Sequence, residues 1–188
     1  MILSKKDYKQ YIKLDLEANN IKDWKWIHRF SRQVIYFQRM LRKLEYIQNC
    51  RHDFMSRIYL KFLMYKFRKM SIALGFTIPL NVFGAGLSIA HYGSIVVNKN
   101  TRVGENCRIH SGTNIGTSDG ESATIGNNVY IGPGAKIVGG VTIGDNVAIG
   151  ANAVVISDVP SNVTVGGIPA KIISQKGSSG LILKKVSQ

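Results

Sequence analysis

Cysteine is scarce in this sequence, with only Cys50 and Cys107 among 188 residues. The two cysteines fall in separate segments without a metal-binding or redox spacing, which predicts free thiols in a reducing compartment. The sequence also lacks an 18-residue apolar run free of charges, and its N-terminus carries lysines and an aspartate in place of an apolar signal segment. We therefore expect a cytoplasmic protein.

Acidic residues are also few, because 11 Asp and Glu stand against 25 Lys and Arg, a formal net charge of +14. The imbalance lies in residues 1–79, which hold 17 basic and 6 acidic residues, whereas residues 80–188 hold 8 and 5. A basic segment suits an anionic partner, such as a membrane surface, a polyanionic glycan or nucleic acid. No nucleic-acid-binding motif accompanies the charge, so we do not expect nucleic acid as the partner.

After Pro79 a branched aliphatic residue recurs at every sixth position, most regularly at Ile125, Ile131, Ile137, Ile143, Ile149 and Val155. A period of six fits neither an amphipathic helix nor a hairpin. It predicts a β-solenoid in which each hexad supplies one short strand with its aliphatic residue inside. Three hexads close a triangular coil, and coils stack at ~4.8 Å. The Gly or Asn after each strand allows the unusual φ of a corner.

The period also holds upstream, at Ile89, Ile95, Val103, Ile109 and Ile115, with two interruptions. Two extra residues lie between Ile95 and Val103, and four between Ile115 and Ile125. The second interruption falls in the polar stretch 116–123, which we predict to be a loop leaving the coil. Such exceptions to a rigid repeat are where function tends to lie.

The N-terminal part shows apolar residues at spacings of 3 or 4, which predict helices over residues 4–17, 24–49 and 54–74, the first capped by Ser4. The third helix is apolar on a broad face and basic elsewhere. It either packs against the solenoid or a neighbouring subunit with a solvated basic face, or contacts the inner face of the membrane or a lipid-linked substrate. The predicted fold class is α+β, with a basic helical domain (1–79), a left-handed parallel β-helix (80–173) and a C-terminal tail (174–188).

The repeat resembles the left-handed β-helix of hexapeptide-repeat acyltransferases. Its ending, Asp158-Val159-Pro160 followed by residues 167–171 (Gly-Ile-Pro-Ala-Lys), is similar to that family's closing motif. Residues 89–97 (IAHYGSIVV) are most similar to serine O-acetyltransferases and their relatives in surface-polysaccharide gene clusters. The resemblance implies transfer of an acetyl group from acetyl-CoA to a hydroxyl, with no metal.

His91 occupies the position of the family's general base. A neutral imidazole, with an ordinary pKa of ~6.5, can take the hydroxyl proton at physiological pH. His110 follows nineteen residues later, or seventeen without the insertion, against a coil of eighteen, so it should lie next to His91 and contact or support the substrate. The alternative is that both are exposed strand histidines in a trimer interface, and His28 and His52 are interpreted as surface residues. Asp119 or Glu121, from a neighbouring subunit, could orient the base.

The family binds the pantetheine arm of CoA in a groove between adjacent solenoids, where small corner residues permit close approach. By position, the resemblance assigns this wall to Gly116, Thr117, Gly134, Ala151 and Ser157, and assigns Lys171 to the CoA phosphates. The alternative is that each glycine is only a solenoid corner. We expect a homotrimer with three active sites between subunits, and a possible hexamer through the N-terminal helices.

Two departures bear on the acceptor. The serine enzymes carry an acidic residue before the histidine, where this chain has Ala90, and an Arg-His pair in the loop, where it has Glu121-Ser122. We therefore expect a sugar hydroxyl of a surface polysaccharide or its precursor, with serine O-acetylation for cysteine biosynthesis as the alternative. A γ-class carbonic anhydrase needs three histidines around zinc, and this solenoid has two. A further alternative is an assembly scaffold without catalytic activity, for which replacing His91 by alanine should leave every measurable property unchanged.

Overall fold

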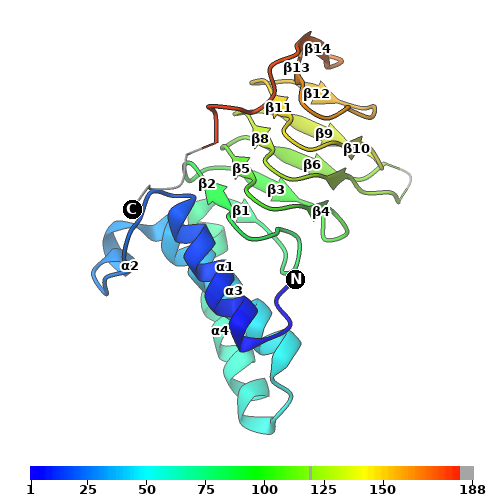
Figure 1. Cartoon of the computed structure of the whole chain (residues 1–188). Helices are drawn as coiled ribbons and strands as arrows, with labels where there is room; N and C mark the ends of the chain where they lie inside the picture. Colours follow the sequence, from blue (N-terminus) through cyan, green and yellow to red (C-terminus); the bar gives the residue numbers. More distant parts are fainter. Residues whose placement is uncertain (119, 183–188) are drawn as a thin grey trace.

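The computed structural model describes residues 1–118 and 120–182. Four helices come first, α1 (Lys5–Glu17), α2 (His28–Ser31), α3 (Gln33–Cys50) and α4 (Phe54–Leu74), and a stack of short strands follows. The helices lie at one end of the stack, next to its first coil (Figure 1). The expected architecture, helices followed by a parallel β-solenoid, is confirmed.

Capping residues explain where α1 and α4 begin. The Ser4 side chain accepts a hydrogen bond from the Asp7 amide, and Asp53 accepts one from the Ser56 amide. α4 ends at Gly75, which has a φ of 76°. The single helix predicted over residues 24–49 was wrong, because Arg32 leaves the helical region (φ −130°, ψ 65°) and separates α2 from α3.

The solenoid has three sheets, which together make about five coils. Sheet A is ordered β1-β3-β6-β9-β12, sheet B β4-β7-β10, and sheet C β2-β5-β8-β11-β13-β14. Only β14 pairs antiparallel among the described strands, and it covers β13 at the far end of sheet C. The strands are β1 (Phe76–Thr77), β2 (Ser88–Ile89), β3 (Ile95–Val97), β4 (Arg102–Val103), β5 (Arg108–Ile109), β6 (Asn114–Gly116), β7 (Thr124–Ile125), β8 (Tyr130–Ile131), β9 (Lys136–Val138), β10 (Thr142–Ile143), β11 (Ala148–Ile149), β12 (Val154–Val155), β13 (Thr164–Gly166) and β14 (Lys171–Ser174).

The sixth-residue aliphatic positions form the core, as predicted. In sheet C, Ile89 is in register with Ile109, Ile131 and Ile149, and all four are at most 2% exposed. One coil alone could not bury these side chains, so the stacking of coils supplies the hydrophobic stabilisation. β1 lies before the predicted start of the β-helix at residue 80 but already pairs with β3. The predicted domain boundaries, after residues 79 and 173, stay predictions.

Asparagines make the corner between sheets B and C. Asn106, Asn128, Asn146 and Asn162 all have a φ between 55° and 66°, the left-handed region that asparagine tolerates better than other side chains. Each side-chain amide donates to the next one along the stack, at 2.9–3.0 Å. Ser178, in the C-terminal segment, crosses this corner and donates a hydrogen bond to the Asn128 carbonyl. The corner is therefore a polar ladder that ties successive coils together.

Replacing Asn128 by alanine should destabilise the fold by about 1–3 kcal/mol, because the ladder is interrupted and alanine disfavours a positive φ. Asn128→Gly removes the same hydrogen bonds but accepts the backbone conformation, so its loss should be smaller. Urea unfolding followed by circular dichroism measures both. A glycine variant that is no more stable than the alanine variant would contradict this explanation of the corner.

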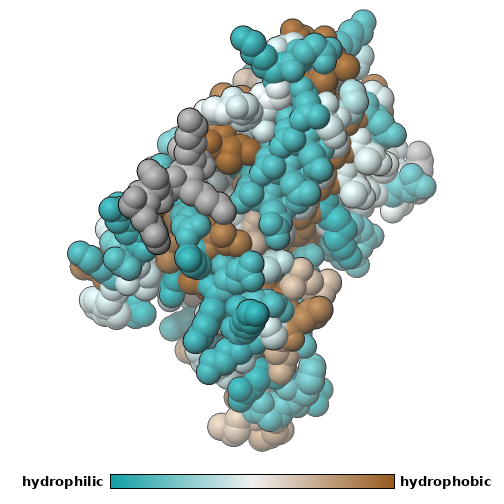
Figure 2. Space-filling model, in the orientation of Figure 1, coloured by the Kyte–Doolittle hydropathy of each residue, from teal (hydrophilic) through white to brown (hydrophobic). Residues whose placement is uncertain are grey.

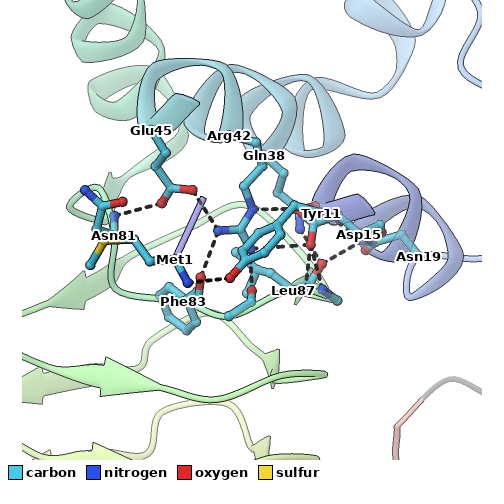
Figure 3. Close-up of polar contacts among 12 residues, drawn as sticks. Met1, Tyr11, Asp15, Asn19, Gln38, Arg42, Glu45, Asn81, Phe83 and Leu87 are labelled. Atoms are coloured by element: carbon cyan, nitrogen blue, oxygen red, sulfur yellow. Dashed lines mark hydrogen bonds and ion pairs between the residues drawn. The ribbon is translucent and has the colours of Figure 1, made fainter. Parts of the chain in front are cut away.

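A buried ionic cluster attaches the helices to the first coil (Figure 3). The Arg42 guanidinium, fully buried, binds Asp15 at 2.8 Å and Glu45 at 3.0 Å, and donates to the carbonyls of Phe83 and Gly84. Asp15 accepts from the Gly86 and Leu87 amides, and Glu45 from the Asn81 amide. Burial lowers the pKa of Arg42, but the Asp15 and Glu45 carboxylates raise it further, so the guanidinium stays charged. Each charge of the cluster thus has a partner on the solenoid or on a helix.

α4 exposes both apolar and basic side chains. Phe54, Met55, Phe62 and Tyr65 are each more than half exposed, and Lys66 and Lys69 lie over the Phe62 and Tyr65 rings. Figure 2 shows brown and teal atoms mixed over the helical half of the molecule. No described helix is long and apolar enough to cross a membrane. Contact of α4 with a membrane surface or with another subunit stays a prediction.

Candidate functional site

The two solenoid histidines lie at the corner where the chain passes from sheet C to sheet A. β2 is in register with β5, and the Ala90 amide donates to the Ile109 carbonyl, so residue 90 lies over residue 110. The rings of His91 and His110 are consequently 6.2 Å apart, centroid to centroid. The proximity expected from the coil length is therefore present, whereas the roles of the two residues stay predictions.

The two rings differ in environment. His91 is exposed, while His110 is half-buried and contacts the Tyr130 ring edge-on at 5.1 Å. The His110 Nε2 atom is buried, with no hydrogen-bond partner among the described residues. Burial, and then the positive charge of Arg108 and the neighbouring His91, lower the pKa of His110. The neutral form of His110 is therefore favoured, beside the exposed His91 ring.

A cavity of about 560 Å³ opens beside His91, between the first coil and the α2–α3 segment. Ala90, His91 and Tyr92 form one edge, and Arg108 extends from β5. The opposite wall comes from residues 30–35, including Arg32 at the break between α2 and α3. No acidic residue of the described chain lines it. The cavity combines a base, two cations and an apolar wall, which suits a small anionic molecule.

The residues assigned to the donor wall divide between two corners. Gly134 and Ala151 follow β8 and β11, at the corner that also carries His91. Gly116 is the last residue of β6, Thr117 follows it, and Ser157 lies beyond β12, all at the other edge of sheet A. Three strand residues at ~3.3 Å each separate the edges by roughly 10 Å. One groove can include both sets only if two chains contribute to it.

The alternative that each glycine is only a solenoid corner has structural support at Gly134. Its φ is 75°, and a Cβ there would overlap the Asn152 side-chain oxygen, so the fold itself favours glycine at this position. Lys171 is exposed on β14, on the last layer of sheet C. These six assignments to acetyl-CoA stay predictions.

Glu121, one of the two loop acids, does not reach His91 within one chain. Asp119 lies outside the described residues. Glu121 lies against Gly140, beyond sheet A from the histidine corner. A role for Glu121 next to His91 would require a neighbouring subunit.

Sequence reasoning missed two arginines of the cavity. Arg108 could have been found, because it precedes the inward-facing Ile109 and must point outward on the coil next to His91. Arg32 had no such signal, since the α2–α3 break that brings it to the cavity was not predicted. His28 and His52 lie outside the cavity lining. No group of His, Cys, Asp and Glu in the described ranges could hold a metal ion.

Two protein-family models match parts of the solenoid. Residues 122–157 match the bacterial transferase hexapeptide (six repeats), and residues 96–133 match the hexapeptide repeat of succinyl-transferase. Residues 96–157 are thus similar to the repeats of hexapeptide-repeat transferases. The resemblance noted in the sequence is thereby confirmed.

Similar proteins are serine acetyltransferases. The enzyme of Synechococcus elongatus is 42% identical over 98 residues, covering 50% of this chain and 40% of that protein. The enzyme of Helicobacter pylori strain J99 is 40% identical over 96 residues, covering 49% of this chain and 56% of its own length. The match thus spans about half the length of these relatives.

Solved structures extend the likeness to the helices. Serine acetyltransferase from Brucella abortus strain S19 superposes with a TM-score of 0.74 and 26% identity, covering 92% of this chain and 71% of that one. The Neisseria gonorrhoeae enzyme, in a complex with serine, gives 0.66 and 29%, covering 92% and 71%. Because 92% of this chain is covered in both comparisons, the helical segment is part of the shared fold.

Proposed function

We propose that the protein is an O-acetyltransferase that moves an acetyl group from acetyl-CoA to a hydroxyl, with His91 as general base and without a metal. The observation that carries the proposal is the exposed His91 imidazole at the edge of a cavity, on a hexapeptide-repeat solenoid. The serine acetyltransferases to which the chain is similar support the reaction type.

His91 would accept the proton of the acceptor hydroxyl as the oxygen attacks the thioester carbonyl. The bond to sulfur then breaks, and the CoA thiolate takes up a proton as it leaves. The surroundings of His110 favour its neutral form, which adds no second positive charge beside the base. In this proposal His110 supports the His91 ring and does not itself transfer the proton.

L-serine is the acceptor we propose. The sequence alone favoured a sugar hydroxyl, but the similar proteins are serine acetyltransferases, which favours the alternative reading. A sugar acceptor is the second candidate, supported by Ala90 beside His91 and by the lack of acidic residues in the described cavity lining, where a serine ammonium would find no partner.

Assembly follows from the division of the donor wall. We propose that neighbouring subunits form the acetyl-CoA groove, one contributing the corner with Gly134 and Ala151 and the other the corner with Gly116, Thr117 and Ser157. A homotrimer with three such grooves satisfies this requirement. Analytical ultracentrifugation with and without CoA measures the oligomeric state, and a monomer that binds CoA would contradict it.

The acceptor is tested by measuring CoA release with a thiol-reactive dye. We expect release that depends on L-serine and yields O-acetylserine by mass spectrometry, whereas L-alanine, which lacks the hydroxyl, should give only background hydrolysis. Release with sugars but not with L-serine would establish the second candidate. Failure to release CoA with any hydroxyl compound would refute acetyl transfer.

A further inference from the structure

Two arginines face the cavity beside His91 without a counter-ion. Arg108 and Arg32 both line it, and no carboxylate in the described part of the chain lies within ion-pairing distance of either guanidinium. The lining holds no acidic residue that could balance them. A half-enclosed site with two cations and no anion is electrostatically suited to an anionic ligand.

The fold gives Arg108 room to reach the cavity. It lies in register between Ser88 and Tyr130 on the outer face of sheet C. Ser88 is small, buried, and hydrogen-bonded to Asn19 at the end of α1. Ser88 and Arg108 both line the cavity, so these neighbouring positions of sheet C contribute to one wall.

Arg32 approaches from the other side. The helix break that separates α2 from α3 places it in the wall formed by residues 30–35. The two guanidinium groups therefore come from elements 76 residues apart in sequence, one on the solenoid and one on the helical segment. Both arginines line the cavity beside His91. Arg32 is exposed and Arg108 is only half-buried, so the packing of the fold does not explain why arginine stands at these two positions.

We propose that Arg108 and Arg32 bind the carboxylate of the acceptor and so select hydroxy-carboxylates as substrates. This rests on the proposed function, in which the acceptor hydroxyl meets His91. Guanidinium groups bind carboxylates through paired, charge-assisted hydrogen bonds. An ammonium group finds no acidic partner in the described lining, so recognition depends on the carboxylate. Two sources share this chemistry, a hydroxy amino acid and an acidic sugar.

Matched acceptors test the carboxylate directly. L-serine is compared with L-serinamide, in which a neutral carboxamide replaces the carboxylate and the ammonium is kept, and galacturonate with galactose. We expect the wild-type protein to prefer one acid over its neutral counterpart by roughly 10- to 100-fold in kcat/KM, the range for a charge-assisted hydrogen bond. The acid that is preferred shows whether the acceptor is a hydroxy amino acid or an acidic sugar. Equal use of the acid and its neutral partner would overturn the proposal.

Arg108→Gln should remove most of that preference through KM for the acid, while the neutral acceptor and the KM for acetyl-CoA are unaffected. Arg32→Gln should act in the same direction. Arg57→Gln is the matched control, because Arg57 lies on exposed α4, outside the cavity. An equal loss for acid and neutral acceptors, or a changed sedimentation coefficient, would show that Arg108 serves the fold or pairs with a second copy instead.

Calorimetry separates this inference from the reaction itself. Titration of L-serine and galacturonate into the wild-type protein and Arg108→Gln measures binding without turnover. Binding of an acid that is lost in Arg108→Gln supports the anion site even if CoA is never released, in which case only the proposed function fails. Acetyl transfer without any preference for a carboxylate would support the proposed function and refute the proposed anion site.

Discussion

Replacing His91 by asparagine should lower CoA release by at least about 100-fold, since general-base catalysis contributes roughly 10²–10⁴-fold. Asparagine keeps a polar side chain of similar reach but cannot accept and carry the hydroxyl proton. The loss should appear in kcat, with little change in the KM for either substrate, because the base acts in the transition state. Steady-state kinetics with the thiol-reactive dye measures both parameters.

The stability of the fold should not change in His91→Asn, because His91 is exposed and no described hydrogen bond depends on its ring. The melting temperature and CoA affinity of His91→Asn should match the wild type. His52→Asn is the control for loss of a histidine, since His52 is exposed and lies outside the cavity. An active His91→Asn variant would leave an assembly scaffold as the better explanation of the solenoid.

Asp15→Ala should cost about 3–5 kcal/mol, because it leaves the fully buried Arg42 without its nearer carboxylate. It also removes the acceptor for the Gly86 and Leu87 amides. A domain is stabilised by only about 5–15 kcal/mol in total, so the variant should lose much of its cooperative folding. Denaturant unfolding followed by fluorescence of the two tryptophans measures the effect.

An exposed ion pair on the same helix gives the comparison. Glu17→Ala breaks a pair with Lys13 at 3.8 Å and should cost less than about 0.5 kcal/mol. The triple variant Asp15→Leu, Arg42→Met and Glu45→Gln should recover part of the loss, because no charge is then left buried alone. If Asp15→Ala and Glu17→Ala were equally mild, the buried cluster would not be what holds the helices to the solenoid.

Much of the fold could be predicted because its determinants are local or periodic. The six-residue repeat placed Ile109, Ile131 and Ile149 in the core, and the spacing of apolar residues predicted a helix over the residues of α4. The break at Arg32 had no such marker, since neither proline nor glycine occurs there. Its conformation follows from packing between segments distant in sequence, which a single-sequence pattern does not record.

The candidate site, like the fold, could be predicted only where its determinants are local or periodic. Coil length predicted that His91 and His110 would be neighbours, because a rigid repeat converts sequence separation into spatial distance. The donor wall was assigned to a groove between adjacent solenoids; sheet A separates Thr117 from Gly134 within one chain, and the assignment stays a prediction. Arg32 reached the cavity through tertiary structure alone.

The cluster around Arg42 also determines how the molecule ends. A stack of parallel strands offers unpaired amides and carbonyls at its first coil, on which another solenoid could dock and extend into a filament. Here side chains from α1 and α3 occupy those groups at Gly84, Gly86 and Leu87, while β14 runs antiparallel over the last coil of sheet C. The helical segment therefore covers the polar backbone groups through which a second solenoid could add to the first coil.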